Sequence, residues 1–136
     1  MATSASETFR ASLRRCLAHT DFLREFYESF MGSSPEVRDK FRNTEFPRQT
    51  RVLADSLYIM AVASESRADA IAWKELDRLA ERHSRNGLDI RPEFYESWLE
   101  CLIKAAREFD PDFSPEIEVA WRSALAPGIE HLRARY

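Results

Sequence analysis

Glycine is scarce in this sequence, with only 3 among 136 residues. Tight β-hairpin turns depend on glycine, so its scarcity argues against a hairpin-rich β architecture. No two glycines lie close enough to form a Gly-rich phosphate-binding loop, which excludes nucleotide chemistry of that kind. The two cysteines, Cys16 and Cys101, are far apart and stand at apolar helical positions. This predicts reduced thiols in a cytoplasmic protein rather than a metal site.

Long apolar runs and an excess of one charge are missing too. No apolar run approaches the roughly 20 residues that cross a bilayer, and the polar N-terminus lacks the basic start and apolar stretch of a signal peptide. The 20 basic and 23 acidic side chains leave a net charge of −3, whereas a surface that binds nucleic acid is normally strongly basic. We therefore expect neither a membrane nor a nucleic acid as a partner.

What the chain has is a balance of 44% hydrophobic and 32% charged residues, typical of a single globular domain over residues 1–136. Its apolar residues recur at intervals of three and four, which predicts helices, and no stretch alternates long enough for a strand. The main rows are Phe9, Leu13, Cys16 and Leu17; Phe22, Phe26 and Phe30; Leu53, Leu57 and Met60; Trp73, Leu76, Leu79 and Ala80; Tyr95, Trp98, Leu102 and Ala106; and Ile117, Trp121, Leu125 and Leu132.

Short polar signals separate these rows. Ser-Pro-Glu at residues 34–36 and again at 114–116 is a helix start, because serine caps free N–H groups, proline suits the first turn and glutamate complements the helix dipole. Asn86-Gly87 and Asp110-Pro111-Asp112 are stop signals. Pro127 lies inside the last row, so we expect a kink or an early end there. The result is about seven uneven helices, an irregular all-α fold rather than a four-helix bundle.

Two residues stand out as candidates for chemistry. His83 continues the apolar face of Leu79 and Ala80, and it is either a satisfied boundary residue or a ligand, since imidazole is a common axial ligand of haem iron. Tyr27 lies on the aromatic-rich row between Phe26 and Phe30. It is either a core tyrosine or a hydroxyl directed at a ligand in an apolar pocket.

A resemblance to a known family covers nearly the whole chain. Phe26-Tyr27, Pro35-Glu36-Val37 and Phe41 resemble the B and C helices of bacterial single-domain haemoglobins and of the globin domain of flavohaemoglobins. Residues 79–83, Leu-Ala-Glu-Arg-His, and residues 90–95, Ile-Arg-Pro-Glu-Phe-Tyr, resemble their F helix, FG corner and the start of helix G. Ala120-Trp121 resembles the first half of helix H. The resemblance implies a globin-like fold, with about seven helices around a haem pocket.

The family pattern also implies roles for individual residues. His83 would be the proximal ligand of the iron of haem b (iron protoporphyrin IX), and Phe41 the aromatic ring that wedges against the haem. Tyr27 would be the distal hydroxyl that donates a hydrogen bond to bound O2. On helix E the resemblance places Gln49 at the distal polar position and Leu53 one turn later; a shift of one residue would place Arg48 or Thr50 there instead of Gln49. The remaining pocket contacts would be Leu79, Ile90, Trp98 and Tyr95, with Arg85 reaching a haem propionate.

The resemblance leaves several functions open. The first is reversible binding of O2, or of another diatomic gas such as NO or CO, at the haem. The second is NO dioxygenation, which would need a separate reductase to supply electrons. The third is gas sensing, as in the globin domain of globin-coupled sensors, with the signal passing to a partner protein. A haem-free regulatory module is disfavoured because His83 is present. Both a monomer and a homodimer fit the sequence.

Overall fold

The computed structural model describes residues 3–136, which form seven α-helices and no strand. The helices are α1 (Ala5–Leu17), α2 (Phe22–Gly32), α3 (Pro35–Lys40), α4 (Phe46–Glu65), α5 (Ala70–His83), α6 (Phe94–Phe109) and α7 (Pro115–Ala134). The predicted all-α fold of about seven uneven helices is confirmed. Among the described residues no helix is long and apolar enough to cross a membrane.

The predicted start signals act as expected. The Ser34 and Ser114 side chains accept hydrogen bonds from the N–H groups of Val37 and Ile117, and a proline follows each serine in the first turn. Pro127 does not end the last helix early, because α7 continues to Ala134. Helix α5 ends at His83, before the Asn86-Gly87 stop signal. The start signals at residues 34–36 and 114–116 and the stop signals at 86–87 and 110–112 therefore lie within a few residues of the observed helix ends.

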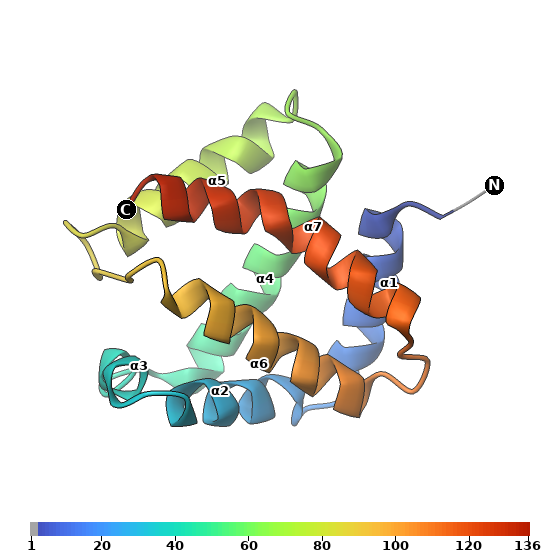
Figure 1. Ribbon diagram of the computed structural model, residues 1–136, viewed down its shortest axis with the longest axis horizontal. Helices are drawn as coiled ribbons and strands as arrows, with labels where there is room; N and C mark the ends of the chain where they lie inside the picture. Colours follow the sequence, from blue (N-terminus) through green and yellow to red (C-terminus); the bar gives the residue numbers. More distant parts are fainter. Residues whose placement is uncertain (1–2) are drawn as a thin grey trace.

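Helix α7 is the centre of the packing, since it contacts α1, α4, α5 and α6, while α2 packs along α6 (Figure 1). Its Trp121 is fully buried, and the ring meets Phe9 of α1 edge-on at 4.7 Å between centroids. The short helix α3 lies at the edge of the molecule, and α2 is the helix against which it mainly packs. This arrangement leaves a space between α3, α4, α5 and α6 that the core side chains do not fill, as shown below.

Helices α4 and α7 approach closely at Gly128. A Cβ atom added there would lie 2.6 Å from Cε and 2.9 Å from Cγ of Met60. We expect Gly128→Ala to lower the free energy of unfolding by about 1 kcal/mol, because overpacking of about 1–3 kcal/mol exceeds the gain of alanine over glycine in a helix. Urea unfolding would measure the change. Gly32→Ala is the matched control, since nothing lies within 4 Å of its added Cβ; equal stability of the two variants would contradict the prediction.

Candidate functional site

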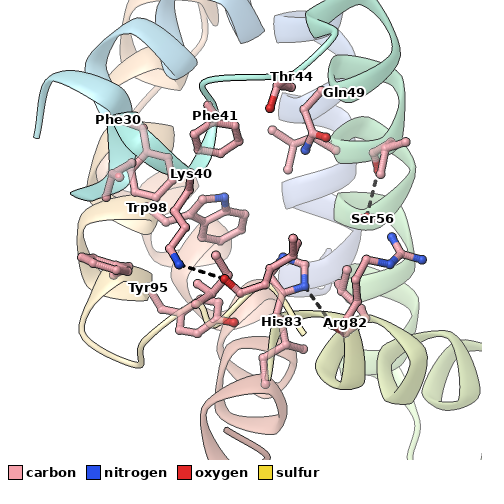
Figure 2. A pocket seen from close by; sticks show the side chains of 18 of the residues that line it. Phe30, Lys40, Phe41, Thr44, Gln49, Ser56, Arg82, His83, Tyr95 and Trp98 are labelled. Atoms are coloured by element: carbon pink, nitrogen blue, oxygen red, sulfur yellow. Dashed lines mark hydrogen bonds between the residues drawn. The ribbon is translucent and has the colours of Figure 1, made fainter. Parts of the chain in front are cut away.

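A cavity of about 340 Å³ opens between α3, α4, α5 and α6 and the segment that joins α5 to α6. Most of its wall is apolar or aromatic, as is usual in sites that bind small molecules. The lining side chains are Tyr27, Phe30, Val37, Lys40, Phe41, Thr44, Gln49, Val52, Leu53, Ser56, Met60, Leu79, Arg82, His83, Leu88, Ile90, Phe94, Tyr95, Trp98 and Leu132. Figure 2 shows His83 at one end of the cavity and Phe41, Thr44 and Gln49 at the other.

The last residue of α5, His83, presents one free ring nitrogen to this cavity. Its Nδ1 lies 2.8 Å from the carbonyl oxygen of Leu79 one turn earlier. A carbonyl can only accept, so Nδ1 carries the proton and Nε2 keeps its lone pair. Burial lowers the pKa of His83 below its ordinary value, which keeps the ring neutral at pH 7. The local fold therefore leaves the lone pair of Nε2 available to bind a metal ion.

At the other end of the cavity, Tyr27 and Gln49 are joined by a hydrogen bond. The Gln49 Nε2 donates to the Tyr27 hydroxyl oxygen at 3.1 Å, so the tyrosine's own proton is not used in this bond. Burial raises the pKa of Tyr27 to about 12, and the hydroxyl therefore stays protonated at neutral pH. The rings of Phe41 and Phe46 meet Tyr27 edge-on at 5.4 and 5.3 Å between centroids and fix its orientation.

The structure brings most of the predicted site residues together. All of the following line the cavity with His83: Tyr27, Phe41, Gln49, Leu53, Leu79, Ile90, Tyr95 and Trp98. The position of Gln49 also follows from its neighbours on α4. Arg48 is exposed, and the Thr50 hydroxyl donates to the carbonyl of Pro47, so neither is drawn into the cavity.

Arg85 does not reach the cavity, which differs from the expectation that it would contact a propionate. Its guanidinium lies over the ring of Tyr136, 4.9 Å from the centroid, and its backbone N–H donates to the Tyr136 carbonyl oxygen. Two cations that the sequence analysis did not single out line the cavity instead, Lys40 and Arg82. The Lys40 Nζ donates to the Leu88 carbonyl oxygen at 2.9 Å (Figure 2). The place of Arg82 beside the cavity could have been predicted from the sequence, because it directly precedes His83. No pattern near Lys40 in the sequence indicates that it lines the cavity.

Tyr95 adds a second phenol to the cavity wall. It is 92% buried, burial raises its pKa to about 12, and its hydroxyl makes no hydrogen bond within residues 3–136. Within that same range no aspartate or glutamate lines the cavity. Among the residues that the structure describes, His83 Nδ1 has one hydrogen-bond partner, the neutral carbonyl of Leu79.

Comparisons with known proteins agree with this arrangement. A model of the globin family matches residues 11–131. Among solved structures, the chain is similar to PA3967 from Pseudomonas aeruginosa PAO1, a protein described as structurally highly homologous to a human haemoglobin. The two share 34% identity over 98% of each chain, with a TM-score of 0.91. No curated protein matches the chain.

Proposed function

The chain belongs to the globin family, and on that premise we propose that it holds haem b through His83 and binds O2 reversibly beside Tyr27 and Gln49. The family and the fold support a haem-binding globin. The observation that carries the finer proposal is the free Nε2 of a neutral His83, facing an apolar cavity whose other end carries a protonated hydroxyl. Bound haem would supply an iron centre that takes up diatomic gases.

The wall and the opening of the cavity fit a flat, apolar group with carboxylates at its edge. Only four large hydrophobic side chains in residues 3–136 are exposed, and two of them, Val52 and Leu88, line the cavity. A bound group would cover them and remove their apolar surface from water. The cations Lys40 and Arg82 would pair with the carboxylates. His83 would hold the iron, and Phe41 would press against the group from the opposite end.

Tyr27 and Gln49 favour the retention of O2. O2 carries partial negative charge when it is bound, and the hydroxyl proton of Tyr27 is available because Gln49 already donates to the phenol oxygen. A hydrogen bond to a charged acceptor contributes about 1.5–3 kcal/mol. Reversible binding is favoured over oxidative turnover because His83 is supported by a neutral carbonyl. A carboxylate partner would make its imidazole a stronger electron donor.

The test is the visible absorption spectrum of the purified protein with haem supplied, first reduced and then exposed to CO and to O2. We expect a haem spectrum, a CO complex and an oxygenated form that persists and is reversed by removing O2. Failure to take up haem would overturn the proposal. Haem uptake followed by rapid oxidation in O2 would overturn reversible O2 binding while leaving haem binding in place.

Tyr27→Phe is expected to release O2 about 10 to 100 times faster than the wild type. The substitution removes the hydroxyl that accepts from Gln49 and still has its own proton to donate, and each 1.4 kcal/mol is a tenfold change. Stopped-flow replacement of O2 by CO measures the rate. Tyr58→Phe is the matched control, because the Tyr58 hydroxyl lies outside the cavity lining. Equal release rates in the wild type and in Tyr27→Phe would reject the role of Tyr27.

A further inference from the structure

The segment after α5 folds back onto the end of the helix that carries His83. The N–H of Leu88 donates to the carbonyl of Arg82 at 2.8 Å, and the N–H of Ile90 donates to the carbonyl of His83 at 2.9 Å. Gly87 makes this return possible, since a Cβ there would lie 2.3 Å from the Arg82 carbonyl oxygen. The backbone of His83 is thus held by Ile90, and both Leu88 and Ile90 line the cavity.

The residue between them, Asp89, has a backbone that needs support. Its φ of 54° makes it the only non-glycine residue in the described part of the chain with a positive φ. Such a conformation costs free energy and persists when surrounding contacts fix it. Within the turn, the Asp89 N–H donates to the Ser84 carbonyl at 2.9 Å. The side chain of Asp89 is held from outside the turn.

That outside contact comes from Tyr136, which follows α7. Its hydroxyl donates to Oδ1 of Asp89, and the backbone N–H of Arg85 donates to the Tyr136 carbonyl oxygen at 3.1 Å. The Arg85 guanidinium covers the ring of Tyr136. Hydrogen bonding to Asp89 raises the pKa of Tyr136, so the phenol remains a donor at neutral pH. Tyr136 therefore clamps both ends of the segment from Arg85 to Asp89.

We propose that Tyr136 is a positioning residue for the proximal histidine: by holding Asp89 in its left-handed conformation, it keeps Ile90 bonded to the His83 carbonyl and slows the loss of haem. The route has three consecutive steps, from the Tyr136 hydroxyl to the Asp89 carboxylate, along the chain to Ile90, and from the Ile90 N–H to the His83 carbonyl. This inference rests on the proposed function, because His83 is its endpoint.

The test compares Tyr136→Phe with the wild type in two measurements on the full chain. Hydrogen exchange at the amides of Leu88, Asp89 and Ile90 reports the turn directly and requires no haem. Transfer of haem to an excess of a haem-scavenging protein reports retention. A single lost hydrogen bond corresponds to roughly a 2- to 10-fold change in an equilibrium constant, and we expect both rates to rise by about that factor.

Two further variants separate this role from a general loss of stability. Tyr58→Phe removes a phenol hydroxyl from α4 that neither lines the cavity nor bonds to this turn, and is expected to leave both rates unchanged. Asp89→Asn keeps an acceptor oxygen, and asparagine tolerates positive φ, so it is expected to retain more of the amide protection than Tyr136→Phe does.

Each outcome decides a different point. Unchanged amide exchange in Tyr136→Phe would overturn the inference. Faster exchange with an unchanged rate of haem transfer would also overturn it, because the turn would then act independently of haem retention. If the wild type takes up no haem, the proposed function fails, and the exchange result still shows whether Tyr136 holds the turn.

Discussion

His83→Gly is expected to lose stable haem binding, and added imidazole is expected to restore it in part. The substitution removes the one imidazole that lines the cavity within residues 3–136, and it leaves a space of imidazole size at the end of α5. The apolar wall alone would then hold haem weakly. Titration of the reduced protein with haem, followed by the absorption spectrum with and without imidazole, measures both effects.

The control for this variant is His19→Ala, because His19 is exposed at the junction of α1 and α2 and does not line the cavity. It should bind haem as the wild type does. Recovery with imidazole separates a ligand from a merely structural histidine, since a free ring can replace a ligand bond but not a lost helix contact. Unchanged haem affinity and spectrum in His83→Gly would contradict proximal ligation by His83.

Local signals predicted the parts of the structure that depend on neighbouring residues. The serine caps at Ser34 and Ser114 are such signals, because both partners of each hydrogen bond lie within three residues. The apolar row ending at His83 predicted a histidine on the inner face of a helix, and the structure has it there. Helix periodicity does not depend on distant parts of the chain, so these features could be predicted from the sequence.

Contacts between distant residues were the parts that could not be predicted. Arg85 was expected at a propionate, but its neighbour in space is Tyr136, which lies 51 positions later in the sequence. Lys40 reaches the cavity only because α3 faces the segment that contains Leu88. The sequence left Arg48 and Thr50 as alternatives to Gln49, and the hydrogen bond that Gln49 makes with Tyr27 joins two helices, α4 and α2, which no local pattern predicts. Of the two outcomes expected at Pro127, the early end is wrong, because packing of α7 against four other helices outweighs one lost backbone hydrogen bond.

A buried polar cluster at the turn between α6 and α7 belongs to the same class of long-range contact. The side chain of Asp110 is fully buried and accepts hydrogen bonds from Ser12 at 2.6 Å and from Arg15 at 2.6 and 2.9 Å. The Asp112 N–H also donates to it, and the Trp121 indole donates to Ser12. The cluster joins α1 to the ends of α6 and α7, and the sequence offered only a helix stop at this position.

Asp110→Ala is expected to lower the free energy of unfolding by about 2–4 kcal/mol. Breaking a buried ion pair costs about 3–5 kcal/mol when one charge is left behind. We expect a smaller loss of stability here because the Arg15 side chain is 32% exposed. Ser12 would also lose its acceptor while buried. Asp112→Ala is the matched control, since the Asp112 side chain is 69% exposed and 3.6 Å from Arg15, and its loss should change stability by less than about 1 kcal/mol.

The effect of Asp110→Ala should also depend on pH. Burial alone would raise the pKa of Asp110, but the bonds from Arg15, Ser12 and Asp112 outweigh it and leave the pKa lowered. A carboxyl group whose pKa is lower in the folded state stabilises the fold above its unfolded pKa, and this contribution is lost as the pH falls through the folded pKa. Urea unfolding of the wild type and the variant should therefore differ most near pH 7 and converge in acid. A difference in stability that stays constant from pH 7 into strong acid would mean that packing, and not the charge of Asp110, joins α1 to this turn.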